Sequence, residues 1–181
     1  REFNTNQKAF VENGFFLPEA KSELSWVDNN TILVSTNFGE GTLTDSGYPR
    51  VTKTWTRGTD LSDATLLYEG AQEDIWIGAY HDPQPGFERT IVYQGLTFYS
   101  NNMFLQGKKG LQKIEKQESA NASLWKDTLL LELREDWTID GKTYVAGSLL
   151  SAPFKKWLRG KRTITVLFTP DEKSSLARFS T

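Results

Sequence analysis

Short extended runs rich in apolar and aromatic residues, separated by turn residues, recur along this chain and are typical of β-strands. The clearest stretch is Asp74–Asp82, where Ile75 and Ile77 share one face of an extended strand. Trp76 and Tyr80 share its other face. Because both faces carry apolar side chains, we expect this strand to be covered on both sides.

Two further segments, Ser22–Asp28 and Ala122–Asp127, resemble this strand. Their tryptophans extend the similarity, since Trp26, Trp76 and Trp125 are 50 and 49 residues apart. A constant interval of this length indicates a repeat architecture. We expect the three tryptophans to pack successive repeats against each other.

Each repeat contains about four predicted strands that turn signals separate. The predicted repeats span residues 22–69, 73–115 and 122–168, with an orphan outer strand at about 8–12 and the start of another repeat at 175–181. Four-stranded units at this period are typical of β-propeller blades. The sequence therefore predicts an all-β fold with about three four-stranded antiparallel blades. Three blades are too few to close a ring, so we expect an open, partial propeller.

The third repeat contains two local features of its own. Asp140 and Gly141 form a strong hairpin turn signal. Residues 152–158 place Phe154 and Trp157 three positions apart and are expected to form a helical turn. The last full strand is expected at Thr163–Phe168.

Composition and charge argue against several classes of function. The chain has 181 residues, a net charge of −2 and no cysteine, which argues against nucleic acid, an anionic membrane, a disulfide framework or a thiolate metal site as the basis of its function. We expect no membrane and no cofactor as partners. The chain begins at Arg1, so we interpret it as a piece of a longer protein. We expect a cytoplasmic location, or a periplasmic one for a longer parent.

A series of short motifs resembles one known family. The motifs are Ala9–Phe15, Leu17–Ser22, Asn37–Gly41, Ser46–Arg50, Pro85–Arg89, Asp136–Thr138, Tyr144–Leu150 and Val166–Phe168. In this order they are similar to the propeller of bacterial prolyl oligopeptidase-like serine peptidases. The resemblance implies a seven-bladed propeller that caps an α/β-hydrolase domain with a Ser-Asp-His triad. It also implies that the propeller admits only short peptides.

The catalytic residues of that family map onto no position of this sequence. Gly-x-Ser-x-Gly does not occur in it, and the hydrolase domain is absent from these residues. The chain is therefore expected to be a non-catalytic propeller fragment, with the hydrolase domain as its partner in the parent chain and short peptides as the parent's substrates. Because blade faces and strand edges would be unpaired, we also expect the isolated fragment to self-associate.

The stretch from Asn37 to Arg50 is the most loop-rich part of the chain. It lacks a Lys-Ser/Thr ending and a following helix, so it is not a phosphate cradle. It either lines an entrance or interdomain contact, or it is a plain hairpin connection. The candidate residues are Phe38, Gly39, Gly41, Tyr48 and Arg50. Arg50 is a candidate partner for a carboxylate on a neighbouring domain.

His81 is the only histidine, and it has no serine nucleophile motif nearby. A structural role is therefore favoured over catalysis or zinc binding. Pairs of carboxylates such as Glu132 and Asp136 suggest a glycosidase only if their spacing fits, which the sequence does not give.

A second class of function is a stand-alone module that binds carbohydrate or peptide. Trp55, Trp137 and Trp157 are the candidates for exposed stacking platforms. Aromatic residues at strand spacing are, however, more often part of a core.

Overall fold

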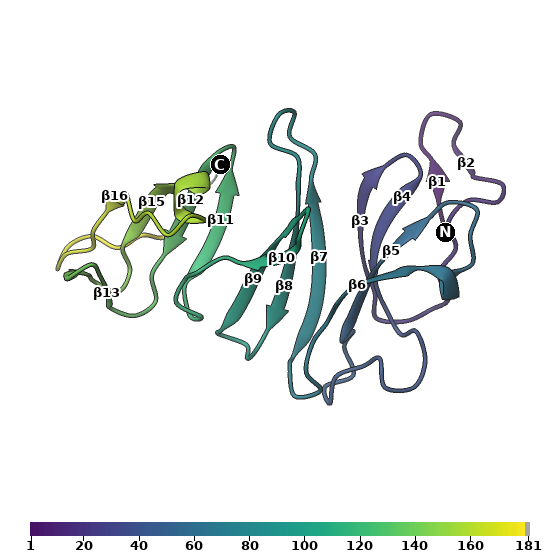
Figure 1. Ribbon diagram of the computed structural model, residues 1–181, viewed down its shortest axis with the longest axis horizontal. Coiled ribbons are helices and arrows are strands. Elements are labelled where there is room, and N and C mark those ends of the chain that lie inside the picture. Colours follow the sequence, from purple (N-terminus) through teal and green to yellow (C-terminus); the bar gives the residue numbers. More distant parts are fainter. Residues whose placement is uncertain (180–181) are drawn as a thin grey trace. The chain divides into compact units, whose positions relative to one another are not determined.

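The computed structural model describes residues 1–179 and confirms the predicted all-β architecture (Figure 1). Three four-stranded antiparallel sheets form the framework, as propeller blades require. The chain divides into two compact units. The first contains residues 1–98 and 103–112, and the second contains residues 99–102 and the chain from Lys113 onward.

The first sheet contains β3 (Glu23–Asp28), β4 (Thr31–Ser35), β5 (Val51–Thr56) and β6 (Thr65–Glu69) in that order. A short 3-10 helix, η1 (Leu61–Asp63), precedes β6. Neighbouring strands are antiparallel, so the sheet is an up-and-down meander.

One face of this sheet holds a small hydrophobic core. Ile32, Val34, Trp55 and Ala64 are buried there, and Phe15 packs against them. Ile32 and Val34 are alternate residues of β4, Trp55 comes from β5, and Ala64 follows η1.

A two-stranded sheet precedes the first blade and corrects one prediction. The orphan strand expected at 8–12 is shortened to β2 (Ala9–Phe10), which pairs with β1 (Phe3–Asn4). β1 was not predicted because its two residues are too few to show a period in the sequence. Glu2 anchors this hairpin, because its carboxylate accepts hydrogen bonds from Arg57 at 2.7 and 2.8 Å.

The second sheet has the order β10-β9-β8-β7. Its strands are β7 (Trp76–Asp82), β8 (Arg89–Gly95), β9 (Asn101–Gly107) and β10 (Gly110–Lys113). Within the first unit, β7 packs against β3 and β4 of the first sheet. The backbone N–H of His81 on β7 donates to the hydroxyl of Ser25 on β3 at 2.9 Å.

The third sheet has the order β11-β12-β15-β16. Its strands are β11 (Asn121–Trp125), β12 (Thr128–Glu132), β15 (Leu149–Pro153) and β16 (Thr165–Phe168). The predicted Asp-Gly hairpin forms as β13 (Trp137–Ile139) and β14 (Lys142–Tyr144), a separate two-stranded sheet between the second and third strands of the blade.

The helical turn of the third blade is shorter than predicted. Residues 152 and 153 belong to β15, and only α1 (Phe154–Trp157) is helical. Leu150 and Ala152 are buried beside β12, so sheet pairing prevails over the helical spacing of the apolar residues. Phe154 begins the helix directly after Pro153.

The further blade predicted to start at 175–181 does not form a strand in the part that the structure describes. Residues 175–179 have no helical or strand structure, and Ser180 and Thr181 lie outside the described residues. Within residues 1–179, no helix has the length and apolarity needed to cross a membrane.

Candidate functional site

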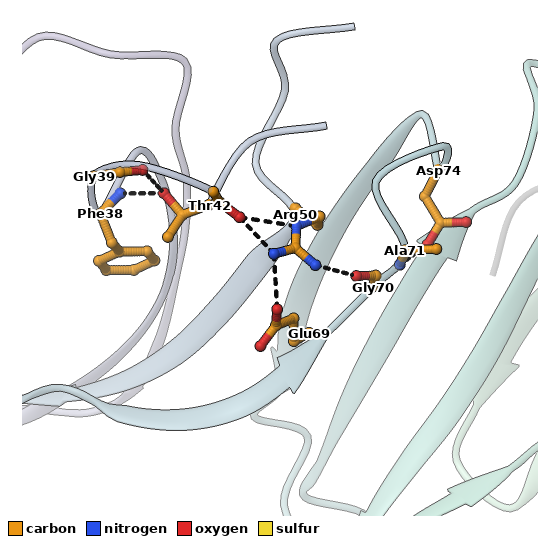
Figure 2. Close-up of polar contacts among 9 residues, drawn as sticks. Phe38, Gly39, Thr42, Arg50, Glu69, Gly70, Ala71 and Asp74 are labelled. Atoms are coloured by element: carbon orange, nitrogen blue, oxygen red, sulfur yellow. Dashed lines mark hydrogen bonds and ion pairs between the residues drawn. The ribbon is translucent and has the colours of Figure 1, made fainter. Parts of the chain in front are cut away.

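The loop from Asn37 to Arg50, which joins β4 to β5, is held by its own polar groups (Figure 2). The Thr42 hydroxyl donates to the Gly39 carbonyl at 2.7 Å and accepts the Phe38 backbone N–H at 2.9 Å. Gly39 and Gly41 have positive φ angles of 117° and 75°, which favour glycine. The loop is therefore an ordered turn.

Arg50 is the centre of this loop. Its guanidinium donates to the Gly70 carbonyl at 2.9 Å and twice to the Gly41 carbonyl, and it forms an ion pair with Glu69 at 2.8 Å (Figure 2). The planar guanidinium fits such a fork of acceptors. The sequence suggested that Arg50 pairs with a carboxylate on a neighbouring domain. In the structure its guanidinium instead pairs with Glu69 and with backbone carbonyls of the first unit.

Tyr48 lies in the second turn of the loop. The Thr44 N–H donates to the Tyr48 carbonyl at 2.8 Å, and Gly47 closes the turn at a φ of 71°. The ring of Tyr48 is partly exposed and carries the Lys21 ammonium 3.9 Å from its centroid. An exposed aromatic ring of this kind is a suitable surface for cations.

The end of the loop is fastened to the second sheet inside the first unit. The Pro49 carbonyl accepts the Ile77 N–H at 2.8 Å, and the Thr44 hydroxyl donates to the Ile75 carbonyl at 3.2 Å. These two hydrogen bonds link the loop to β7 and to the residue before it.

A buried carboxylate, Asp74, supports the turn before β7. It accepts the Ala71 N–H at 2.8 Å and the Gln94 amide at 2.9 Å. Burial and the nearby Asp74 carboxylate raise the pKa of Tyr68. With both of these contacts inside the fold, we assign Asp74 a structural role.

The loop borders a cavity of about 460 Å³. The cavity is lined by Asn37, Gly39, Glu40, Gly41, Leu43, Thr44 and Gln72. Its lining offers amide, hydroxyl and carboxylate groups but neither a histidine nor a lysine. These groups can form hydrogen bonds with a ligand.

Comparisons with known proteins show which proteins this chain resembles. No family model matches the chain. It is 30% identical over 187 residues to the uncharacterized peptidase y4nA of Sinorhizobium fredii, covering 98% of this chain and 26% of that protein. It is 27% identical over 190 residues to the uncharacterized peptidase RP174 of Rickettsia prowazekii, covering 95% of this chain and 26% of that protein.

A solved structure of a peptidase also resembles this chain. The structure of a post-proline cleaving enzyme from Rickettsia typhi matches with a TM-score of 0.86 and 27% identity. The match covers 94% of this chain and 27% of that one. Over nearly its whole length, this chain therefore resembles a propeller segment of the prolyl oligopeptidase type. It spans about a quarter of the length of the relatives it matches.

His81 contacts the neighbouring strand. Its Nδ1 lies 3.0 Å from the hydroxyl of Thr90 on the neighbouring strand β8. Among residues 1–179, no group of three or more His, Cys, Asp or Glu side chains is placed to hold a metal ion.

The predicted packing tryptophans differ in their surroundings. Trp76 is partly buried and stacks on Tyr93 with ring centroids 6.4 Å apart. Trp26 and Trp125 are about half exposed, and Trp26 contacts Phe15 in an edge-on arrangement. Their role in packing blades stays a prediction.

The tryptophans considered as sugar platforms lie mostly in the interior. Trp55 and Trp157 are buried, and the ring of Trp137 packs edge-on against Trp157 at 6.2 Å. Trp55 and Trp157 therefore cannot offer the exposed faces that sugar stacking needs.

Sequence reasoning missed one polar centre in the second unit. The Lys116 Nζ lies within hydrogen-bond distance of four backbone carbonyls, those of Asn101 at 2.8 Å, Gln117 at 3.0 Å, Ala120 at 3.0 Å and Glu118 at 3.4 Å, which share its three N–H donors. Burial lowers the pKa of Lys116 to about 8. No pattern in the sequence indicates such a carbonyl cage, because the acceptors are backbone atoms. Its role is to fix the segment before β11.

Proposed function

We propose that this chain is a non-catalytic part of a cap that limits the access of peptides to a serine active site outside residues 1–181. One observation carries the proposal. Nearly the whole chain matches about a quarter of a post-proline cleaving enzyme, and the matching residues contain no Gly-x-Ser-x-Gly. A segment with this relationship contributes to the function of a peptidase without supplying its nucleophile.

The ordered loop supports a role in selection by size. A barrier excludes long peptides only if its rim stays in place when a substrate presses on it. Arg50 joins the loop to β6, and Pro49 joins it to β7, so the loop is held on two sides. We place Phe38, Gly39, Gly41, Tyr48 and Arg50 at an entrance or at the contact with a catalytic domain in the same polypeptide.

The first test uses the 181-residue chain alone. It should neither hydrolyse a proline-linked chromogenic peptide nor react with a fluorophosphonate probe for activated serines. A longer polypeptide that includes the chain and the sequence after it should do both. Labelling of the chain at a serine, with turnover that the probe abolishes, would overturn the proposal.

A further inference from the structure

A cavity of about 290 Å³ lies between the first and second sheets, inside the first unit. It is lined by Glu23, Tyr48, Ile75, Trp76, Thr97 and Phe98. Glu23 begins β3 and Trp76 begins β7, so the packing of these two strands assembles the cavity. It is separate from the cavity beside Gly39.

The carboxylate of Glu23 is unpaired. Among residues 1–179, no hydrogen bond or ion pair engages it. Glu23 is exposed to solvent, and partial burial of its carboxylate by the neighbouring residues raises its pKa. A carboxylate in this condition gains free energy from a cationic partner because it has not already been neutralised.

Gly78 makes room for this carboxylate. A Cβ atom at Gly78 would collide with Glu23 Oε2 and lie 2.8 Å from an atom of the Trp76 ring. The Glu23 carboxylate and the Trp76 indole therefore both lie over Gly78 of β7, which has no side chain. Any larger residue at position 78 would displace one of them.

Aromatic rings form the remaining walls. The Trp76 ring is fixed by stacking on Tyr93 and lies against Gly95. Phe98 is 85% exposed, so its ring is open to a ligand. Tyr48 already holds the ammonium of Lys21, which is not among the residues that line the cavity. One wall of the cavity thus shows the cation–π contact that the other rings offer.

We propose that the Glu23–Trp76–Phe98 cavity binds an organic cation, a primary ammonium or a guanidinium, that a short peptide carries. The carboxylate supplies the charge, and the ring faces replace the water that the cation loses. The peptide as carrier rests on the proposed function, whereas the preference for a cation rests on the cavity alone.

The test measures binding to the 181-residue chain by Trp fluorescence and by calorimetry. The probes are N-acetyl-arginine amide, N-acetyl-lysine amide and glycyl-leucine amide, which place the cation on a side chain or at a peptide N-terminus. N-acetyl-citrulline amide is the neutral control. We expect saturable binding of at least one cationic probe, at least about fivefold tighter than citrulline. The probe that binds most tightly identifies the source of the cation.

Two variants locate the site. Glu23→Gln should weaken binding by about fivefold or more, and Phe98→Ala by about threefold, whereas the exposed control Glu19→Gln should bind normally. Because the Phe98 side chain is largely exposed, we expect Phe98→Ala to fold like the parent chain. The proposal would be overturned if Glu23→Gln bound the cationic probes as tightly as the parent chain does. It would also be overturned if the parent chain bound the citrulline amide as tightly as the cationic probes.

These measurements need no catalysis. Binding can therefore fail while the size selectivity of a longer polypeptide is intact, and the reverse can also occur. The two proposals are tested separately.

Discussion

Arg50 and Glu69 form an ion pair at 2.8 Å that joins the start of β5 to the end of β6 (Figure 2). The pair is only part of the arrangement, since Arg50 also donates to the carbonyls of Gly41 and Gly70. A long loop is thus stabilised by a side chain that lies at its own C-terminal end. This explains how a glycine-rich connection keeps a defined shape.

Loss of the Arg50 side chain should loosen the loop. Arg50→Met removes the donors to Gly41 and Gly70 and leaves the carbonyls to water, at a cost of about 1–3 kcal/mol in the free energy of unfolding. Thermolysin should then cleave near Leu43 faster than in the parent chain. Arg134→Met is the matched control, because Arg134 is exposed. Equal cleavage of the two variants would contradict the role given to Arg50.

The Lys116 cage makes stability depend on pH. The pKa of Lys116 is about 8 in the folded chain, compared with 10.5 as its ordinary value. Between these values the unfolded chain holds the proton more often than the folded chain does. The free energy of unfolding therefore rises with pH across this window.

Lys116→Met removes this titrating group. Between pH 7.5 and pH 10, the free energy of unfolding of the parent chain should rise relative to that of Lys116→Met by on the order of 2 kcal/mol. Urea unfolding at both pH values measures it. A change of opposite sign would mean that the four carbonyls stabilise the charged form by more than burial destabilises it.

The N-terminal hairpin should open in acid. The hydrogen bonds from Arg57 lower the pKa of Glu2 below its ordinary value of 4.5. The ionised Glu2 carboxylate therefore stabilises the fold above pH 4.5, and this stabilisation is lost as the pH falls through the folded-state pKa. Amide hydrogen exchange of Phe10, which pairs with Phe3, should accelerate at pH 3 relative to the chain average. Glu2→Gln should show fast exchange already at pH 7. Equal protection of Glu2→Gln and the parent chain at pH 7 would show that the hairpin does not depend on this ion pair.

Two tryptophans provide a matched test of the third blade. Trp157 is 2% exposed and donates its Nε1–H to the Glu115 carbonyl at 2.7 Å, whereas Trp125 is 47% exposed. Trp157→Ala should reduce the free energy of unfolding by about 3–5 kcal/mol. Trp125→Ala should cost less than about 1 kcal/mol in the isolated chain. A large effect of Trp125→Ala would indicate that it packs against another surface.

Self-association remains our expectation for the isolated chain. Several large apolar side chains of the first unit are exposed, among them Phe10, Phe16 and Leu24. Exposed apolar surface of this kind tends to find a partner. Light scattering should show a mass that rises with concentration, and a strictly monomeric mass at high concentration would contradict this.

The sequence was sufficient for the blade architecture because the repeat is long and regular. Trp26, Trp76 and Trp125 marked three four-stranded sheets before any contact was known. For residues 152 and 153 the helical prediction is wrong, since an apolar run beside a proline fits a strand end and a helix start equally well. Only pairing with β12 decides between them.

The candidate sites were less predictable, for a physical reason. Arg50 and Glu69 are 19 residues apart, and nothing in a strand pattern indicates that a guanidinium reaches back over its own loop. Glu23 and Trp76 are 53 residues apart and meet only because β3 packs on β7. Such contacts depend on tertiary packing, which local periodicity does not encode.

The central claim concerns selection by size in a polypeptide that contains this chain together with a serine active site. The most direct measurement is kcat/KM for one proline-linked cleavage site carried by a short peptide and by a long one, in the parent polypeptide and in Arg50→Met. We predict that the parent strongly prefers the short peptide and that Arg50→Met cleaves the long peptide at least about threefold better, with little change for the short one, since a looser rim admits larger substrates. Equal kcat/KM for the two peptides in the parent would contradict the account.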